Sequence, residues 1–285
     1  MIIEYSARSY VGIARENNED NLYVDGTILP LDLLKRTFAI DGNTYFPAIF
    51  AVCDGMGGEE NGELASLLTV QVLSDCSEKI KIAASRSPSQ INVLVQSFID
   101  ESIDKIHAEA VKYGSRMGTT LALVVASKDG IHCFNIGDSR IYVLHMTVFK
   151  QLTNDHTVIS GGEKNGSLTP DQTMAEKYEK KLTRCIGIGD VQIAENYPPI
   201  VGNCRILICS DGLSDMVSST EIEHTLRVSG LPADATTSLL KLALENGGWD
   251  NISVIVVDIK VPKASYEIRK VLRNFLRFIR DLLYS

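Results

Sequence analysis

The chain places its two longest helical patterns next to each other instead of alternating them with strands. Segments 63–84 and 88–113 both carry apolar residues at helical spacing, and Pro88 suits the first turn of a helix. Consecutive helices followed by a series of strands argue against a doubly wound parallel sheet, in which the two kinds of element alternate. The sequence therefore predicts an α+β domain built in layers. In the second helix, the stripe facing the core is expected to run through Val93, Leu94, Ser97, Phe98, Ile103 and Ile106.

Five apolar runs are short enough, and rich enough in Val, Ile and Leu, to be strands. They cover residues 48–54, 118–127, 131–144, 205–211 and 251–259. Lys128-Asp129-Gly130 is a hairpin turn signal between the second run and the third, and Asp138 marks a further hairpin turn inside the third. Segment 231–248 contains an early proline and ends in glycines, which predicts one more helix.

Composition limits the classes of protein to which such a chain can belong. Its 285 residues are 45% hydrophobic and can bury a substantial core, as one large domain or two small ones. The formal net charge of −8 disfavours broad nucleic-acid binding, which needs a basic face. The six cysteines form no C-x-x-C pair, and the N-terminus lacks the order of a signal peptide, so a reducing cytoplasm is expected. No apolar run approaches the roughly 20 residues that span a bilayer, so a soluble protein is expected.

Acidic side chains recur where the expected strands begin or end, and in the polar segment near the N-terminus. Strand ends hold oxygen ligands at fixed separations while water can still enter, and this is the environment that Mg²⁺ and Mn²⁺ prefer. No cluster of His and Cys ligands accompanies these carboxylates, which argues against structural zinc. Asp-Gly is also a common turn dipeptide, so any one of them taken alone is open to a structural role. The carboxylates are Glu19, Asp20, Asp54, Asp138, Asp211 and Asp250.

The order of the motifs is more specific than any single one. Along the chain they read R-x-x-N-E-D-N, D-G-M-G-G, G-T-T, G-D-S-R, L-T-x-D-H, S-D-G and D-N-I-S-V. From Ser6 to Asp258 the chain therefore resembles the metal-dependent protein phosphatases of the 2C type, the PPM family, and in particular their bacterial type. The resemblance implies a four-layer αββα sandwich, with two antiparallel sheets flanked by helices. Residues 1–260 would form the phosphatase domain and 261–285 a C-terminal helical extension.

The same resemblance implies a serine/threonine protein phosphatase that acts in signal transduction. It would hydrolyse phosphoserine and phosphothreonine with a metal-activated water at a centre of two Mn²⁺ or Mg²⁺ ions. Cations are needed there because a phosphomonoester dianion repels hydroxide at neutral pH. Asp54 would bridge both ions, and the carbonyl of Gly55 would reach one of them. Asp211 and Asp250 would complete one ion's shell.

Three further acidic residues and one arginine receive roles from the resemblance. Glu19 and Asp20 would hold the second ion directly or through water. Asp138 matches the residue that, with Asp211, holds a third and weaker ion in bacterial-type members. Arg15 would grip the phosphoryl group through bidentate hydrogen bonds that a lysine could not match in geometry.

Met56 departs from the pattern of many animal members, which carry a histidine there as the general acid for the leaving group. Methionine cannot donate a proton; bacterial-type members share it, and the source of that proton stays open. His156 is the only histidine in a family motif, and a structural role is favoured over general acid catalysis. Cys53 is expected to be a small buried hydrophobe, and Trp249 to pack under Asp250.

Two other classes of function are alternatives to the phosphatase. A nuclease or small-phosphoester hydrolase could use the same carboxylates but would need a basic groove or a nucleotide pocket. A silent module that binds phosphoproteins would be favoured by lost metal ligands, whereas every motif position is filled. For a phosphatase, the partners would be phosphorylated proteins, including a Ser/Thr protein kinase or its targets.

Two segments lie outside these assignments. Residues 160–172 have loop composition and fall where the family has a variable flap, so a plain loop and a substrate-selecting element are equally open. The C-terminal segment 261–285 has a helical apolar stripe and an opposing basic face. Packing on its own domain, docking to a partner or to a second copy of the chain, and docking to a membrane surface are the three alternatives for it.

Overall fold

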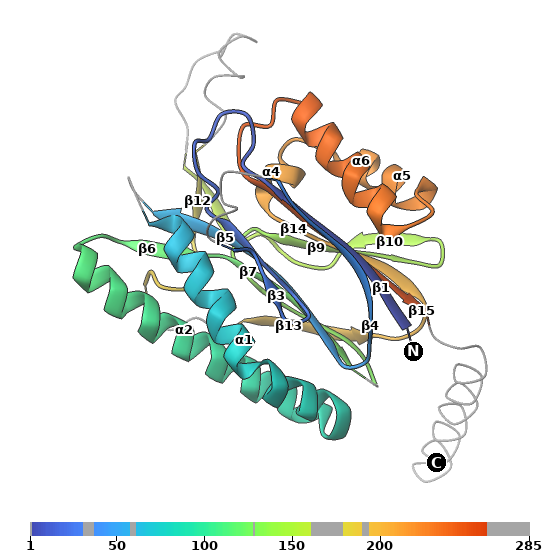
Figure 1. The fold of residues 1–285 in the computed structure, drawn as a ribbon, viewed down its shortest axis with the longest axis horizontal. Helices are drawn as coiled ribbons and strands as arrows, with labels where there is room; N and C mark the ends of the chain where they lie inside the picture. The colour runs from blue at the N-terminus through green and yellow to red at the C-terminus, as the bar shows by residue number, and fades with distance from the viewer. Residues whose placement is uncertain are drawn as a thin grey trace.

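The computed structural model of the chain describes residues 2–30, 37–57, 61–127, 129–160, 179–189 and 194–260. Figure 1 shows four layers, with a helical pair on one side, two sheets in the middle and a second helical pair on the other side. The first pair is α1 (Gly62–Arg86) and α2 (Ile91–Tyr113), and the second is α5 (Ser219–Val228) and α6 (Pro232–Glu245). The predicted αββα sandwich of two flanked sheets is therefore confirmed.

The first sheet has six strands, and every neighbouring pair in it is antiparallel. Strand β15 lies near its middle, between β14 and β1, and α6 packs across β15 and β1. In spatial order the strands are β10 (Val148–Gln151), β9 (Arg140–His145), β14 (Cys204–Cys209), β15 (Ile252–Lys260), β1 (Ile2–Tyr10) and β4 (Phe38–Tyr45).

The second sheet has seven strands and lies against α1. Its main path is β13 (Glu195–Ile200), β8 (Gly130–Ile136), β7 (Leu121–Ser127), β5 (Ala48–Gly57), β2 (Asp20–Val24) and β3 (Thr27–Ile28). The short strand β6 (Met117–Thr119) pairs with the last residues of β5. A separate two-stranded ladder joins β11 (Thr157–Ser160) to β12 (Glu179–Leu182). The one-turn helices η2 (Pro88–Gln90) and α4 (Asp211–Ser214) complete the elements of the described chain.

Three apolar layers fill the sandwich, one between each pair of adjacent layers. The central strands therefore face an apolar layer on both sides, which explains why β7 and β8 are buried at every residue and read as continuous apolar runs. Phe50 lies in the layer between the two sheets, while the neighbouring Ile49 faces the helices. Period-two alternation thus places successive residues in different apolar layers.

Several sequence expectations are corrected by the structure. Residues 131–144 are not a hairpin around Asp138, because β8 belongs to the seven-stranded sheet and β9 to the six-stranded one. The turn between them carries the chain from one sheet to the other, with Gly137 at a φ of 99°. On α2, Val93 is 70% exposed and Ser97 is also exposed, since the buried face runs through Val95 and Ile99 instead. The five predicted runs do not include the strands β2, β3, β4, β10, β11, β12 and β13.

Among the described residues, no helix is both long enough and apolar enough to cross a bilayer. Two predicted features fall largely outside the described residues: the C-terminal segment 261–285, and the loop 160–172 beyond Ser160. The proposed boundary between a 1–260 domain and a C-terminal extension therefore stays a prediction.

Candidate metal centre

The carboxylates come together because strand ends from both sheets meet at one end of the sandwich. Asp20 begins β2 and lies opposite Asp54 of β5 in the antiparallel register. Asp211 follows β14, and Asp250 precedes the neighbouring strand β15. Asp138 lies in the turn that crosses between the two sheets.

These ends line a cleft of about 570 Å³. Seven of the eight predicted site residues line it: Arg15, Glu19, Asp54, Gly55, Asp138, Asp211 and Asp250. The cleft also contains Met56, Arg116, Thr120, Lys181, Leu182, Ile188 and Asn251, to which the sequence reading gave no role in binding. A volume of this size accommodates a ligand much larger than one phosphoryl group.

Asp20 is the predicted site residue that does not line the cleft. Its side chain is only 1% exposed and lies beneath the cleft. One carboxylate oxygen, Oδ2, accepts a hydrogen bond from the hydroxyl of Ser210 over 2.8 Å, whereas the other, Oδ1, is buried without a hydrogen-bond partner. Burial raises the pKa of Asp20 to about 7, although Ser253 and Ser210 act in the opposite direction. A buried carboxylate with an unsatisfied oxygen is poised to accept a hydrogen bond or a cation.

Asp54 is surrounded by other carboxylates, whose negative charges repel its own. Burial raises its pKa well above the ordinary value, and the negative charges of Asp20, Asp211, Asp138 and Asp250 raise it further. Burial and the charges of Asp138 and Asp250 likewise raise the pKa of Asp211 to about 8. Like charges at close range disfavour the ionised forms, so positive charge placed among them would be strongly stabilised.

Gly55 is a glycine because two other backbone segments approach it. A Cβ at this position would lie 2.2 Å from the carbonyl oxygen of Gly62 and 2.5 Å from that of Glu19. The Gly55 N–H already donates to the Glu19 carbonyl over 3.1 Å. Close packing of β5 against the start of α1 and the segment before β2 therefore leaves no room for a side chain.

Two threonines of the G-T-T motif hold Asp54 through its backbone. The Asp54 N–H donates to Oγ1 of Thr120 over 2.9 Å, and the Asp54 carbonyl accepts from Oγ1 of Thr119, also over 2.9 Å. Thr120 in turn shares a 2.6 Å hydrogen bond with Ser139, which neighbours Asp138. The G-T-T motif is visible in the sequence but this role is not, because the bonds cross between elements far apart in the chain.

Asn251 is a second residue whose role was missed. Its Oδ1 accepts from the Glu19 N–H over 2.7 Å, and its Nδ2 donates to the carbonyls of Val11 and Asn17 over 2.8 and 2.9 Å. Its own N–H donates to Oδ1 of Asp250 over 2.8 Å. Asn251 therefore fixes the positions of Glu19 and Asp250, and its place in the D-N-I-S-V motif was the signal available in the sequence.

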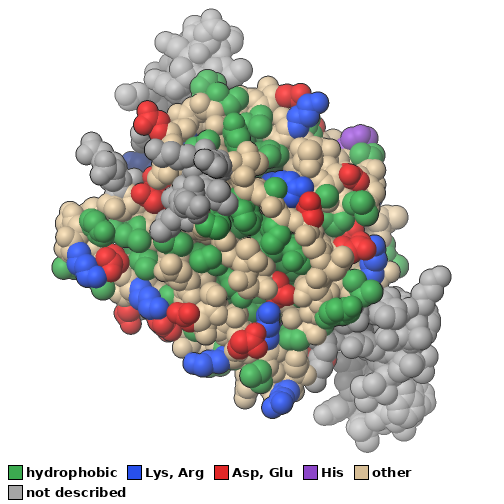
Figure 2. All heavy atoms as spheres, in the orientation of Figure 1, with side chains coloured by type: hydrophobic (Ala, Val, Ile, Leu, Met, Phe, Trp, Pro, Cys, Tyr) green, Lys and Arg blue, Asp and Glu red, His purple; other side chains and the backbone are tan. Residues whose placement is uncertain are grey.

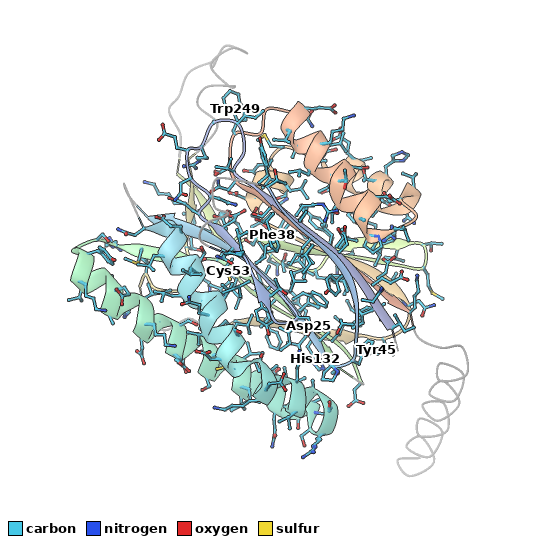
Figure 3. All side chains as sticks on the ribbon, viewed as in Figure 1. Asp25, Phe38, Tyr45, Cys53, His132 and Trp249 are labelled. Carbon is cyan, nitrogen blue, oxygen red and sulfur yellow. The ribbon has the colours of Figure 1, made fainter. Side chains whose placement is uncertain are left out.

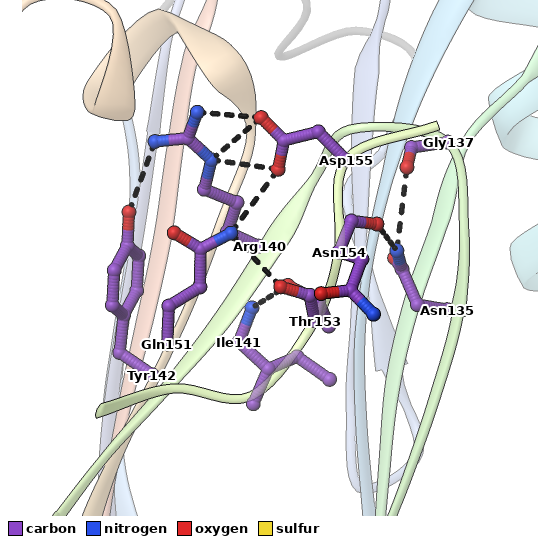
Figure 4. Close-up of polar contacts among 9 residues, drawn as sticks. All are labelled: Asn135, Gly137, Arg140, Ile141, Tyr142, Gln151, Thr153, Asn154 and Asp155. Carbon is purple, nitrogen blue, oxygen red and sulfur yellow. Dashed lines mark hydrogen bonds and ion pairs between the residues drawn. The ribbon is translucent and has the colours of Figure 1, made fainter. Parts of the chain in front are cut away.

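Hydrogen bonds hold the loop 152–156 beside the turn that carries Asp138. The Arg140 guanidinium makes bidentate hydrogen bonds to Asp155 at distances of 2.6 to 3.1 Å, drawn in Figure 4. His156 continues this loop: its Nδ1 accepts from the Gly137 N–H, and its own N–H donates to the Gly137 carbonyl, both over 3.0 Å. His156 is buried and does not line the cleft, which agrees with the structural role favoured for it.

Arg15 lies in the cleft but is already paired with one of the acidic residues. Its Nη2 donates to Oδ2 of Asp250 over 2.8 Å, and its side chain is 52% exposed. The rest of the guanidinium fork faces a cleft open to solvent, so it can form further charge-assisted hydrogen bonds.

Two other expectations have clear outcomes, shown by the labels in Figure 3. Cys53 lies inside the sandwich and is fully buried; burial, followed by Asp20 and Asp54, raises the pKa of its thiol, so it is not a nucleophile. The expectation that Trp249 packs under Asp250 is wrong. Trp249 lies on the loop before β15 and is 66% exposed, with its indole against the glycine at 247 instead.

The donor set fits hard divalent cations. It offers carboxylate oxygens that line a solvent-open cleft, with one buried and unpaired oxygen of Asp20 beneath them. Within the described ranges, no three acidic, histidine or cysteine side chains are already drawn together tightly around one point. Like charges at close range repel each other, so a cation placed among these carboxylates would draw them together.

Replacing Asp20 with asparagine is expected to stabilise the cation-free protein, and to do so more at about pH 8 than at about pH 5.5. The pKa of Asp20 is about 7 in the fold against 3.8 ordinarily. Its ionisation therefore favours the unfolded chain: the contribution that the neutral Asp20 carboxyl makes to stability is complete below pH 3.8, falls as the pH rises, and is lost above about 7. Asparagine removes this loss, and thermal unfolding in chelator at the two pH values measures it.

Asp41→Asn is the matched control, because the hydrogen bond from Arg8 lowers the pKa of Asp41 instead. This control variant should not be stabilised at the higher pH. If the gap between the Asp20→Asn and wild-type midpoints does not widen with pH, the buried-charge account of Asp20 is wrong.

Comparisons with known proteins agree with the geometry. The sequence matches the protein phosphatase 2C family over residues 38–239. The protein phosphatase PhpP of Streptococcus pneumoniae is 31% identical over 269 residues, which cover 92% of this chain and all of that protein. The serine/threonine phosphatase stp of Listeria monocytogenes is 30% identical over 217 residues, 74% of this chain and 84% of the relative.

Solved structures that resemble this chain are also serine/threonine phosphatases. The Mycobacterium tuberculosis serine/threonine phosphatase PstP/Ppp superimposes with a TM-score of 0.71 at 28% identity, covering 92% of this chain and 100% of that one. The catalytic domain of PstP in complex with two manganese ions gives a TM-score of 0.68 at 28% identity, covering 91% and 99%. The chain therefore belongs to the protein phosphatase 2C family.

Proposed function

We infer that this chain is a serine/threonine protein phosphatase whose cleft hydrolyses phosphoserine and phosphothreonine esters in proteins. The observation that carries the inference is the set of acidic side chains lining one cleft around Asp54, in a chain of this family. The relatives are named as serine/threonine phosphatases, which supports the substrate class. This class of enzyme also supports a role in signal transduction.

We propose two Mn²⁺ or Mg²⁺ ions as the cofactors, with Asp138 and Asp211 able to hold a third. Support comes from the donor set and from the PstP catalytic domain, which was solved with two manganese ions. Asp54, the Gly55 carbonyl, Asp211 and Asp250 are the proposed direct ligands, together with Glu19. Bound there, divalent cations supply a lowered pKa for water and offset the charge on the phosphoryl group.

Asp20 supports this centre from below in the proposed arrangement. It lies opposite Asp54 in the strand register and is buried beneath the cleft. Its unpaired Oδ1 is the atom available to a water or to a cation. Ser210 fixes the other oxygen, so the carboxylate is oriented before anything binds.

The chain's own residues would bind and orient the substrate. Arg15 stands at the mouth with an exposed guanidinium and would hold two phosphoryl oxygens while keeping its contact to Asp250. Asn251 fixes Glu19 and Asp250, and Thr119 and Thr120 fix Asp54, so the carboxylates are held before the substrate arrives. Met56 lines the cleft and has no proton to give to the leaving alkoxide.

The competing classes find less support in the described residues. A nuclease would need a continuous basic groove for the phosphodiester backbone. On the face shown in Figure 2, basic side chains of the described residues lie singly among acidic ones. A silent phosphoprotein-binding module would have lost acidic positions, whereas each of the predicted carboxylates is present, either lining the cleft or directly beneath it.

Phosphate release from matched peptides tests the proposal. Protein stripped with chelator and resupplied with Mn²⁺ should release phosphate from phosphoserine and phosphothreonine peptides and leave bis(p-nitrophenyl) phosphate, a diester, nearly untouched. Faster cleavage of the diester would indicate the nuclease class. Tight binding of the phosphopeptides without release would indicate the silent module.

The cellular partners proposed are phosphorylated proteins, including a Ser/Thr protein kinase or its targets, in the cytoplasm. The C-terminal segment 261–285 is proposed to dock on a partner or on a membrane surface instead of serving catalysis. Its sequence supports this: it carries six Lys and Arg residues against one Glu and one Asp, interleaved with an apolar stripe.

Deletion of the chain from Lys263 onward is expected to leave metal-dependent hydrolysis of a soluble phosphopeptide within about twofold of the full chain. The reason is that the last core strand, β15, ends at Lys260, before the cut. Steady-state kcat/KM and size-exclusion chromatography of the two proteins make the comparison. Aggregation or loss of activity in the truncated protein would instead show that the segment packs on its own domain.

A further inference from the structure

Basic residues from a separate set of elements also line the cleft. Arg116 comes from the connection between α2 and β6, and Lys181 from β12, whereas the acidic residues come from the ends of the sandwich strands. Apolar side chains of Leu182 and Ile188 line the cleft along with them. The cleft therefore combines an anionic centre with a cationic, partly apolar wall.

Arg116 is held in place by the structure on either side of it. The preceding Ser115 is fixed, since its N–H donates to the Ala110 carbonyl and its hydroxyl accepts from Asn61. The following Met117 is completely buried and begins β6, which pairs with the end of β5 next to Gly55. The backbone of Arg116 is therefore anchored to the same strand that carries Asp54.

The side chain of Arg116, in contrast, is exposed, and its guanidinium makes no ion pair or hydrogen bond with any described residue. Arg15 differs in this respect, because it is already paired with Asp250. An arginine fixed at its backbone, with an unpaired guanidinium facing a binding cleft, can form bidentate hydrogen bonds to an incoming oxyanion.

We propose that Arg116, together with Lys181, which also lines the cleft, forms a subsite for a second oxyanion of the substrate. This oxyanion belongs to a residue near the phosphorylated Ser or Thr, and it is either a carboxylate or a second phosphate. The proposal rests on the phosphatase function inferred above and adds a substrate preference to it: acidic or doubly phosphorylated sequences over neutral ones.

The charge distribution gives the preference its physical basis. In the metal-loaded protein the cations offset the charge of the carboxylates, so selective attraction of an acidic flanking residue has to come from side chains outside that centre. Arg116 and Lys181 line the cleft outside it, so the preference is specific to the flanking positions that reach them. The cleft of about 570 Å³ has room for flanking residues as well as the phosphoryl group.

Three phosphothreonine peptides of the same length test the subsite: one with neutral flanks, one with glutamates, and one with a second phosphothreonine. Wild-type protein loaded with Mn²⁺ should favour one or both acidic peptides in kcat/KM by about tenfold, mainly through KM, and salt should reduce the preference. Arg116→Gln should reduce the ratio to about twofold or less, and Arg116→Lys should restore it only in part, since lysine lacks the bidentate fork.

Arg227→Gln is the control, because that arginine pairs with Glu223 on α5 and does not line the cleft. It should keep the wild-type ratio. A preference for the glutamate peptide alone assigns a carboxylate to the subsite, and one confined to the doubly phosphorylated peptide assigns a phosphate.

Two results would overturn the inference while leaving the phosphatase intact: equal kcat/KM for all three peptides in the wild type, or an unchanged ratio in Arg116→Gln. Hydrolysis of none of the peptides by the wild type would contradict the proposed function itself, and the subsite with it.

Discussion

Replacing Asp54 with asparagine is expected to reduce hydrolysis of a phosphothreonine peptide by about a thousandfold or more. Asp54 is the carboxylate on which the charges of Asp20, Asp211, Asp138 and Asp250 converge, and it is the proposed bridge between two cations. An amide offers one neutral acceptor oxygen in place of two charged ones and cannot bridge in the same way. Initial rates of phosphate release at saturating Mn²⁺ measure the effect.

The fold should survive this change. Asparagine has nearly the same shape, the Asp54 backbone keeps its bonds to Thr119 and Thr120, and one source of repulsion is removed. Thermal unfolding in chelator should therefore show a variant at least as stable as the wild type. A folded Asp54→Asn protein with wild-type turnover would refute the proposed centre.

Replacing Gly55 with alanine is expected to destabilise the fold by about 1–3 kcal/mol and to abolish turnover. The new Cβ would lie 2.2 Å from the carbonyl oxygen of Gly62 and 2.5 Å from that of Glu19, and backbone atoms cannot rotate away as a side chain can. Relief requires α1 or the segment before β2 to move, and that displacement would shift Glu19 and the Gly55 carbonyl together. Denaturant unfolding and peptide hydrolysis report the two effects separately.

Gly230→Ala is a suitable control for this variant. A Cβ there would meet only Oδ2 of Asp234, at 3.8 Å, which is an ordinary contact. The control should therefore retain both stability and activity. If Gly55→Ala behaves like Gly230→Ala, the close packing around Gly55 has no part in building the site.

Much of the fold could be predicted because apolar runs and helical stripes are local signals. The pairing of α1 with α2, the β7–β8 hairpin and the helix α6 all follow from periodicity and turn residues. The switch at Gly137 could not be predicted, since a tight turn reads the same whether its strands pair or enter different sheets. Val93 was misplaced for a similar reason: among many apolar residues in α2, the buried face depends on the rotation of the helix against the sheet.

Most residues of the candidate site could be named from the sequence, because the order of the motifs indicated a family. Local patterns alone would not have brought these residues together. Seven of the eight site residues line the cleft. The position of Asp20 beneath the cleft depends on its register with Asp54, and the contributions of Asn251 and Arg116 depend on contacts between distant segments. Trp249 was expected to pack under Asp250, whereas the structure places it on an exposed loop.

The most direct test of the central claim is the initial rate on a phosphothreonine peptide as Mn²⁺ is titrated into chelator-stripped protein, with Asp211→Asn alongside. A metal-dependent phosphatase predicts saturable, Mn²⁺-dependent phosphate release by the wild type that is lost in the variant. Phosphate release that is independent of Mn²⁺, or equal in the two proteins, would contradict it.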